Sequence, residues 1–264
     1  MSQIPLSHDE RRLVILPSFN SGSLLVHTAR AALAQSWPVW VVLDGSTDSS
    51  VAEIQQLALE QPTLKVLRLE ENHGKGGACL IAMKEALGAG FTHALIMDSD
   101  GQHPAEKIPE FMNLSQRAPD AMILGEPVFG AEAPSERVNG RKVGNWFSHL
   151  ETLWGGINDS LFGFRLYPLA PAVRIMESIK TARRFDFDTE LAVRLFWAGV
   201  RPINRPVPVF YPPRQEGGVT HFRYLRDNLL LVGTHTRLIV LLFPRLVRVW
   251  QLRQRWLFQT EPSS

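Results

Sequence analysis

The 264-residue sequence contains a single cysteine, Cys79, and no long apolar run. One thiol can form neither an internal disulfide nor a cysteine-based zinc cluster. The longest strongly apolar stretch, residues 238–244, is far shorter than the roughly 20 residues of a membrane-spanning helix. The polar start of the chain shows no signal-peptide core. These absences predict a cytoplasmic protein that is soluble or bound to a membrane surface.

Three nucleotide-binding fingerprints are also missing. The segment after the first apolar run, "PSFNSGS", lacks the G-x-G-x-x-G of dinucleotide oxidoreductases, and the sequence has no G-x-x-x-x-G-K-[ST] loop. The glycine-rich basic loop that opens many nucleotidyltransferases is absent as well. A nucleic-acid binder would need aromatic residues interleaved with basic ones on a sheet face, whereas the basic part of the chain is rich in leucine and valine, so we expect no nucleic-acid partner.

What the sequence does contain is a regular alternation of apolar runs and helical patterns. An α/β domain with a mainly parallel sheet flanked by helices is the expected result. Beyond residue 125 the pattern loosens, and residues 125–142 are predicted to form a loop. The predicted strands are 12–16, 39–44, 64–70 and 92–98, followed by a helix at 142–156, a turn and strand at 161–169, a helix at 186–200 and an extended segment at 200–213.

Paired acids follow the fourth predicted strand, in "MDSDGQH". Alternate residues leaving a strand point the same way, so Asp98 and Asp100 can share one hard cation, and the amide oxygen of Gln102 can join them. Mg²⁺ and Mn²⁺ are such oxygen-binding cations, and Mg²⁺ usually also binds substrate phosphates. The alternative is an ordinary polar turn. All four strand ends carry polar or glycine-bearing segments that meet at one edge of a parallel sheet, and this favours the metal site.

Two further strand ends are candidates for binding a nucleotide. Lys75 lies among glycines before a helix, where backbone amides favour anions, although a solvated lysine in a flexible turn is the alternative. Asp44 and Asp48 either contact a base or ribose, or Asp48 caps the following helix.

The C-terminal part of the chain is strongly basic. Residues 221–258 contain seven arginines and one acid, within a helical pattern interrupted at Pro244. We therefore divide the chain into a domain at 1–221 and a basic amphipathic tail at 222–264. Arginines beside leucine, valine and tryptophan predict binding to anionic lipid through 222–258, at the inner face of the cell membrane. The alternatives are packing on the domain and a dimer contact.

Six motifs occur in order along the chain: "VILPSFN", "VVLDGSTDSS", "NHGKGGA", "MDSDGQHPAEKIPEF", "INDSLFGFRLYPL" and "FDFDTEL". Together they resemble the motifs of family-2 glycosyltransferases, over about residues 11–215. The subgroup resembles dolichyl- or polyprenyl-phosphate mannose synthases, and the segments 146–171 and 217–238 are similar to soluble glycosyltransferases of bacterial aryl-polyene and lipid biosynthesis. The resemblance implies the A-type glycosyltransferase fold, a nucleotide-sugar donor, a lipid-like or polyprenyl-phosphate acceptor and inversion at the anomeric carbon.

The resemblance also assigns residues to the site. Donor-binding residues would be Pro17, Asn20, Asp44, Lys75, Asp98 and Arg141. Asp98, Asp100 and Gln102 match the metal-binding pattern, Asp159, Gly163 and Arg165 lie on the acceptor side, and Asp188 and Glu190 are the candidate bases for a hydroxyl acceptor. For Asp159 the alternative is a helix cap or a turn acid.

Two positions depart from the family pattern. Leu43 replaces the first of two adjacent aspartates, and Glu126 occupies a position where the family carries arginine. Arg137, Arg141 and Lys142 are the candidates to replace that charge.

Two other functions remain as alternatives. A haloacid-dehalogenase-type phosphohydrolase shares the letters "DSDG", but its first aspartate ends the first strand. A non-catalytic sugar-nucleotide binder would use the same crevice without turnover.

Overall fold

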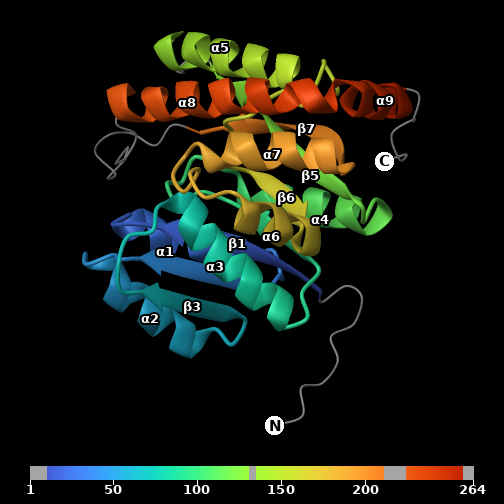
Figure 1. The fold of residues 1–264 in the computed structure, drawn as a ribbon. Helices are drawn as coiled ribbons and strands as arrows, with labels where there is room; N and C mark the ends of the chain where they lie inside the picture. Colours follow the sequence, from blue (N-terminus) through green and yellow to red (C-terminus); the bar gives the residue numbers. More distant parts are fainter. Residues whose placement is uncertain (1–10, 131–134, 211–223, 258–264) are drawn as a thin grey trace.

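The computed structural model describes residues 11–130, 135–210 and 224–257. A seven-stranded sheet forms its centre, in the order β3-β2-β1-β4-β6-β5-β7, with helices on both faces (Figure 1). Only β6 runs antiparallel to its neighbours β4 and β5. This is the A-type glycosyltransferase fold that the sequence predicts.

The strands are β1 (Arg12–Ser18), β2 (Val39–Asp44), β3 (Leu64–Leu69), β4 (His93–Ile96), β5 (Ala121–Phe129), β6 (Arg165–Pro168) and β7 (Arg201–Val209). The α-helices are α1 (Ser23–Leu33), α2 (Ser50–Glu60), α3 (Lys75–Gly88), α4 (Ile108–Arg117), α5 (Ser135–Glu151), α6 (Leu169–Ser178), α7 (Phe187–Ala198), α8 (Tyr224–Leu242) and α9 (Leu246–Leu257). Two short 3-10 turns are η2 (Ala105–Lys107) and η4 (Phe243–Arg245).

The central strands β1, β2 and β4 are buried at every position because both faces of the sheet are covered. In β1, Leu13 and Ile15 belong to the buried cluster that includes residues of α3, α6 and α7. Val14 and Leu16 belong to the cluster that includes residues of α1, α2 and α4. This alternation explains why β1 and β2 read as continuous apolar runs.

The predicted loop at 125–142 is wrong at both of its ends. Residues up to Phe129 extend β5, which pairs in parallel with β7, and α5 begins at Ser135. Proline-rich β7 was expected only as an extended segment. Pro202, Pro206 and Pro208 are an even number of residues apart, so their missing N–H groups all point the same way, which an edge strand tolerates.

The tail forms two α-helices joined at Pro244 by η4, as predicted, and they lie end to end across the molecule (Figure 1). Leu238, Leu242 and Val249 are buried in the same cluster as Leu13. The described part of the tail therefore packs on the domain, whereas its status as a separate unit stays a prediction. Within the helical stretch Leu229–Trp256, an 18-residue window has a mean hydropathy of 1.5, so by length and composition alone this stretch could cross a membrane.

Candidate active site

The loops after β1, β2 and β4 are tied together at the carboxyl edge of the sheet. The side-chain oxygen of Asn20 accepts a hydrogen bond from the backbone amide of Thr47 (2.9 Å). The backbone amide of Asn20 donates to Ser46 Oγ (3.0 Å). Ser99, between the paired aspartates, donates to the Pro17 carbonyl (3.1 Å). The predicted convergence of strand ends is therefore present in the structure.

The carboxylates after β2 contact the protein itself. Buried Asp44 accepts the amide of His73 (2.8 Å) in the loop after β3, and burial raises its pKa. Asp48 accepts the amide of Gly22 (2.8 Å) and the hydroxyl of Ser50 (2.5 Å). Asp48 thus links the starts of α1 and α2, but its side chain accepts no backbone N–H of α2, so it does not form the predicted cap.

Lys75, the first residue of α3, bridges two carboxylates. Its ammonium lies 2.6 Å from Asp98 Oδ1 and 2.8 Å from Asp188 Oδ2, and only 9% of its side chain is exposed. Burial alone would lower the pKa of Lys75, but the two carboxylates outweigh it and raise that pKa. Burial likewise raises and Lys75 lowers the pKa of Asp98, and here the ammonium prevails. Lys75 is therefore held as a cation beside Asp98, one of the acids predicted to bind a metal ion.

Asp98 also lies directly against the loop before β6. A Cβ atom placed on Gly163 would stand 2.1 Å from Asp98 Oδ2, so only glycine fits this position without movement. On its other side, Asp98 Oδ2 is 3.4 Å from His103 Nε2. The His103 ring packs edge-on against Phe162, with ring centroids 4.6 Å apart. His103 was not singled out from the sequence, although its place five residues after Asp98 in the same turn was the available clue.

We expect Gly163→Ala to impair transfer at least about tenfold, because the added methyl group must displace the Asp98 carboxylate from its place beside Lys75. Steady-state kinetics and Mn²⁺ titration would measure the effect. Gly88→Ala is the matched control, since a Cβ atom there meets no atom within 4 Å. Equal activity of both variants would show that the Asp98 position is not critical.

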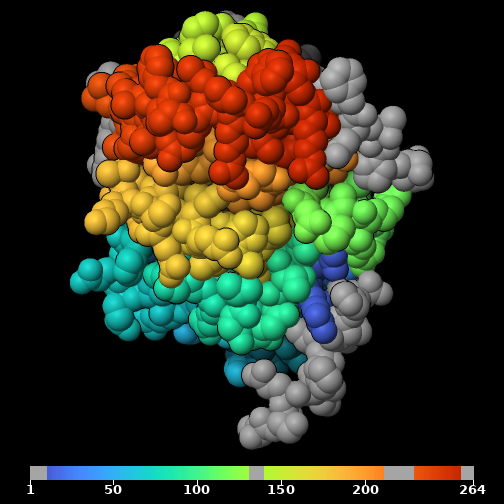
Figure 2. Space-filling view, turned by 45° about the vertical axis from the view of Figure 1, so that its right-hand side comes forward, coloured from blue at the N-terminus to red at the C-terminus, as the bar shows by residue number. Residues whose placement is uncertain are grey.

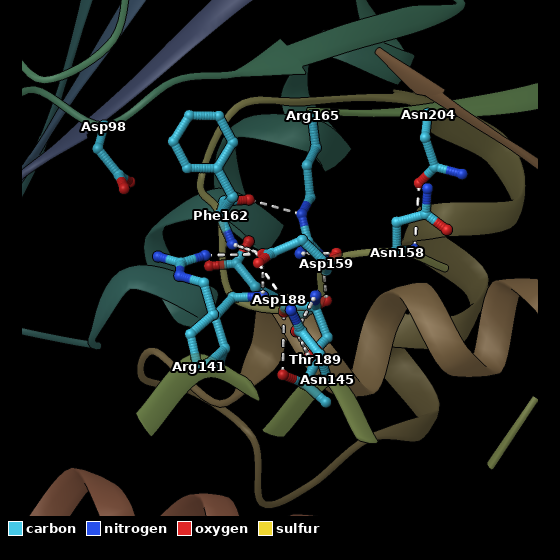
Figure 3. Close-up of polar contacts among 12 residues, drawn as sticks. Asp98, Arg141, Asn145, Asn158, Asp159, Phe162, Arg165, Asp188, Thr189 and Asn204 are labelled. Atoms are coloured by element: carbon cyan, nitrogen blue, oxygen red, sulfur yellow. Dashed lines mark hydrogen bonds and ion pairs between the residues drawn. The ribbon is translucent and has the colours of Figure 1, made fainter. Parts of the chain in front are cut away.

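Asp159 organises the loop that carries Gly163 (Figure 3). Its Oδ1 accepts from Arg141 Nη1 and the Phe162 amide, both at 2.7 Å, and its Oδ2 accepts from Asn145 Nδ2 at 3.0 Å. Burial raises and Arg141 lowers the pKa of Asp159, and the net shift is downward. The turn-acid alternative therefore describes what the Asp159 side chain does.

Arg165 is completely buried behind the same loop (Figure 3). Its guanidinium donates to the carbonyls of Phe162 (2.6 Å), Asp188 (2.7 Å) and Asp159 (3.0 Å). The side chain joins the loop before β6 to the start of α7. Arg165 and Asp159 thus hold the loop before β6 from within, and their predicted place on the acceptor side stays a prediction.

Removing Arg141 should destabilise the fold in a pH-dependent way. Because the folded-state pKa of Asp159 is depressed, its ion pair contributes stability above the ordinary carboxyl pKa of 3.8 and loses it as pH falls through the folded pKa. We expect Arg141→Gln to cost about 1–3 kcal/mol near neutral pH, and less at acidic pH. Urea unfolding across pH would measure this, and a pH-independent difference would contradict the assignment.

Glu190 lies apart from this network. Its buried carboxylate contacts Arg194 (2.6 Å) and Arg237 of α8, and so connects α7 to the tail. Asp188, two residues earlier on α7, points instead to Lys75. Residues two apart on a helix face different directions, which explains the separation. The catalytic role of Glu190 stays a prediction, and its ion pairs favour a structural role.

A pocket of about 420 Å³, including its open space, lies between Asp98 and the loop that carries Gly163. Its wall combines polar and apolar side chains. The lining residues are Asp98, Gln102, His103, Phe129, Arg141, Leu161, Phe162, Gly163 and Val209. The structure thus brings Asp98, Gln102, Arg141 and Gly163 to one cavity.

The donor atoms fit a divalent ion held jointly with a substrate. Within residues 11–130, 135–210 and 224–257, no cluster of three or more His, Cys, Asp or Glu side chains is arranged around a metal position. Asp98 and Asp100 offer two carboxylates, and Gln102 has an amide oxygen at the same turn. Mg²⁺ commonly takes one or two carboxylates and completes its shell with phosphate and water, so this set suits such an ion.

A mainly parallel sheet with paired aspartates after β4 and loops converging at its carboxyl edge agrees with the A-type glycosyltransferase fold. The sequence matches the family description "Glycosyl transferase family 2" over residues 13–171, and the chain belongs to this family of glycosyltransferases. Since the D-x-D follows the fourth strand, the phosphohydrolase alternative, which needs it after the first, is excluded. Family membership makes the chain an enzyme and disfavours the non-catalytic binder.

Two curated relatives cover most of the chain. Polyprenol monophosphomannose synthase of Mycolicibacterium smegmatis is 28% identical over 79% of this chain and 80% of its own. Undecaprenyl-phosphate mannosyltransferase of Micrococcus luteus is 27% identical over 78% of this chain and 86% of its own. A Pyrobaculum calidifontis mannosyltransferase, solved with GDP-Man and Mn²⁺, is 17% identical, with a TM-score of 0.55 over 90% of this chain and 64% of its own. That structure supports the fold.

Proposed function

We propose that this enzyme transfers a sugar from a nucleoside diphosphate sugar to the phosphate of a polyprenyl lipid, with Mg²⁺ or Mn²⁺ held by Asp98, Asp100 and Gln102. The names of the two curated relatives support this acceptor class. The ion would offset negative charge on the departing diphosphate, and Lys75 and Arg141 would add positive charge. Pro17, Asn20 and Asp44 stand at the strand ends where the nucleoside would bind.

The observation that carries the acceptor assignment is the pairing of both candidate bases. Asp188 is bound to Lys75, and Glu190 is bound to Arg194 and Arg237. An alcohol acceptor needs a base to take its proton, whereas a phosphate is already anionic. In the proposed step a phosphate oxygen forms a bond to the anomeric carbon while the bond from that carbon to the diphosphate breaks. The configuration inverts, and no proton has to move.

The test compares two acceptors that differ only in the phosphate. Thermal-shift measurements with GDP-, UDP- and dTDP-sugars and Mn²⁺ would first identify the donor. Labelled donor would then be offered to a short-chain polyprenyl phosphate and to the corresponding polyprenol. We expect transfer to the phosphate alone. Equal transfer to the alcohol would return Asp188 to the role of base, and no stabilisation by any donor would refute the proposal.

The donor class also bears on where the enzyme acts. Nucleoside diphosphate sugars are cytoplasmic metabolites and polyprenyl phosphates are membrane lipids. The proposal therefore places the enzyme in the cytoplasm, at the inner face of the cell membrane.

A further inference from the structure

The tail helices present a continuous apolar stripe to solvent. Its members are Leu229, Val232, Val240, Phe243, Val247 and Trp250, which we call the outer stripe, and each is more than half exposed. Apart from the gap at Thr236, which is also exposed, they follow one another at intervals of three or four residues, so they share one face of α8 and α9. Contiguous exposed apolar surface of this kind marks an interaction site.

The exposed surface around most of the outer stripe carries no charge. From Leu229 to Val247, none of the exposed residues is charged. Arg237 pairs with Glu190, and Arg245 lies over the Trp197 ring, 5.6 Å from its centroid. These arginines hold the tail to α7, so the lipid-binding role predicted for the tail's basic residues does not describe this face.

The opposite face of the tail holds the helices flat on the domain. Leu238, Leu242 and Val249 are buried there, and together with the Arg237 ion pair they fix α8 and α9 along the surface. In space-filling view the two helices form a band across one end of the molecule (Figure 2). In this arrangement the outer stripe faces away from the domain along the whole band.

We propose that the outer stripe docks this enzyme on the surface of a phospholipid bilayer, with α8 and α9 parallel to the membrane plane. A helix with one apolar face and arginines at its flank is typical of the membrane interface. Exposed Arg248 and Arg255, seven residues apart, supply that flank along one side of α9. The inference rests on the proposed function in one respect: a polyprenyl phosphate lies in the bilayer, so an enzyme using it must reach that surface.

A second copy of the chain is the other conceivable occupant. Soluble helix pairs usually flank their apolar seam with charged residues that interact across it. Here Leu230, Leu231, Ile239 and Leu241, partly exposed beside the outer stripe, are apolar. The wider uncharged face favours lipid.

The test is vesicle flotation of the full chain and of Val240→Glu/Val247→Glu. One set of vesicles contains neutral phosphatidylcholine alone, and the other also contains anionic phosphatidylglycerol. We expect the double variant to bind at least about tenfold more weakly, since two charges enter the apolar contact. Leu59→Glu is the matched control, because Leu59 is 82% exposed on α2, outside the tail. Arg248→Ala/Arg255→Ala should weaken binding only to the anionic vesicles.

Transfer to a short-chain, water-soluble polyprenyl phosphate separates the two proposals. Wild-type transfer without vesicle binding would refute docking and leave the proposed function intact. Vesicle binding without transfer would support docking and refute the proposed function. Equal vesicle binding by wild type and Val240→Glu/Val247→Glu also overturns the proposal, as does a wild-type dimer that this variant converts to monomer without any vesicle binding.

Discussion

Replacing Asp100 by asparagine should reduce sugar transfer by about two to three orders of magnitude. The substitution removes one of the two charges that would hold the cation, and electrostatic stabilisation of a leaving group is worth about that much. Asp100 Oδ1 accepts the amide of Gln102 at 3.0 Å, and an asparagine carbonyl can accept the same bond, so the turn should persist. Kinetics at saturating donor would measure the loss.

Removing the metal ion should also reduce sugar transfer. Chelation of wild-type enzyme with EDTA should abolish transfer, and Mn²⁺ should restore it, whereas Asp100→Asn should respond weakly to added Mn²⁺. Asp120→Asn, at an exposed aspartate before β5, serves as the control and should behave like wild type. Full activity in EDTA would mean that the diphosphate is neutralised by side chains alone.

Lys75→Met should have the largest effect on stability. It leaves the carboxylates of Asp98 and Asp188 beside each other without their shared cation, and Asp188 Oδ1 already has no partner among the described residues. Breaking a buried ion pair by removing one partner costs about 3–5 kcal/mol. We also expect transfer to fall below detection, since the cation beside the diphosphate is lost. Chemical unfolding monitored by circular dichroism would measure the stability.

The double variant Lys75→Met/Asp188→Asn tests whether the unpaired carboxylate charge causes the loss of stability. Removing the second charge should restore about 1–3 kcal/mol of the lost stability but no activity. Lys84→Met is the matched control, because Lys84 pairs with Glu177 at 2.6 Å on the surface and surface pairs contribute at most about 1 kcal/mol. If Lys75→Met unfolds like the control, the bridge does not hold the site together.

The position of the D-x-D could be predicted from the sequence because the signal is local. The apolar run marks β4, which ends at Ile96, and Asp98 and Asp100 follow in the turn directly after it. The same holds for β1 and β2, whose continuous apolar composition predicts burial on both faces. Segments with mixed signals were predicted less well: β5 was partly read as a loop, since its end is rich in glycine, proline and acid and gains its pairing only from β7.

The candidate site was harder to predict because its contacts join residues far apart in the chain. Glu190 and Asp188 look equivalent in "FDFDTEL", yet one binds α8 and the other binds Lys75. Asp159 looked like an acceptor-binding acid, but its lone pairs are occupied by Arg141, Asn145 and its own loop. His103 gains importance only because its ring lies between Asp98 and Phe162.

The sequence by itself determined the alternating α/β order, the chemistry at the strand ends and the family to which the chain belongs. These depend on short-range periodicity and on residue type, which a linear pattern records directly. Only the tertiary structure decided which carboxylates are neutralised and which face of the tail meets solvent. Both depend on which charges and apolar groups approach one another across long loops, and packing of the whole chain sets those distances.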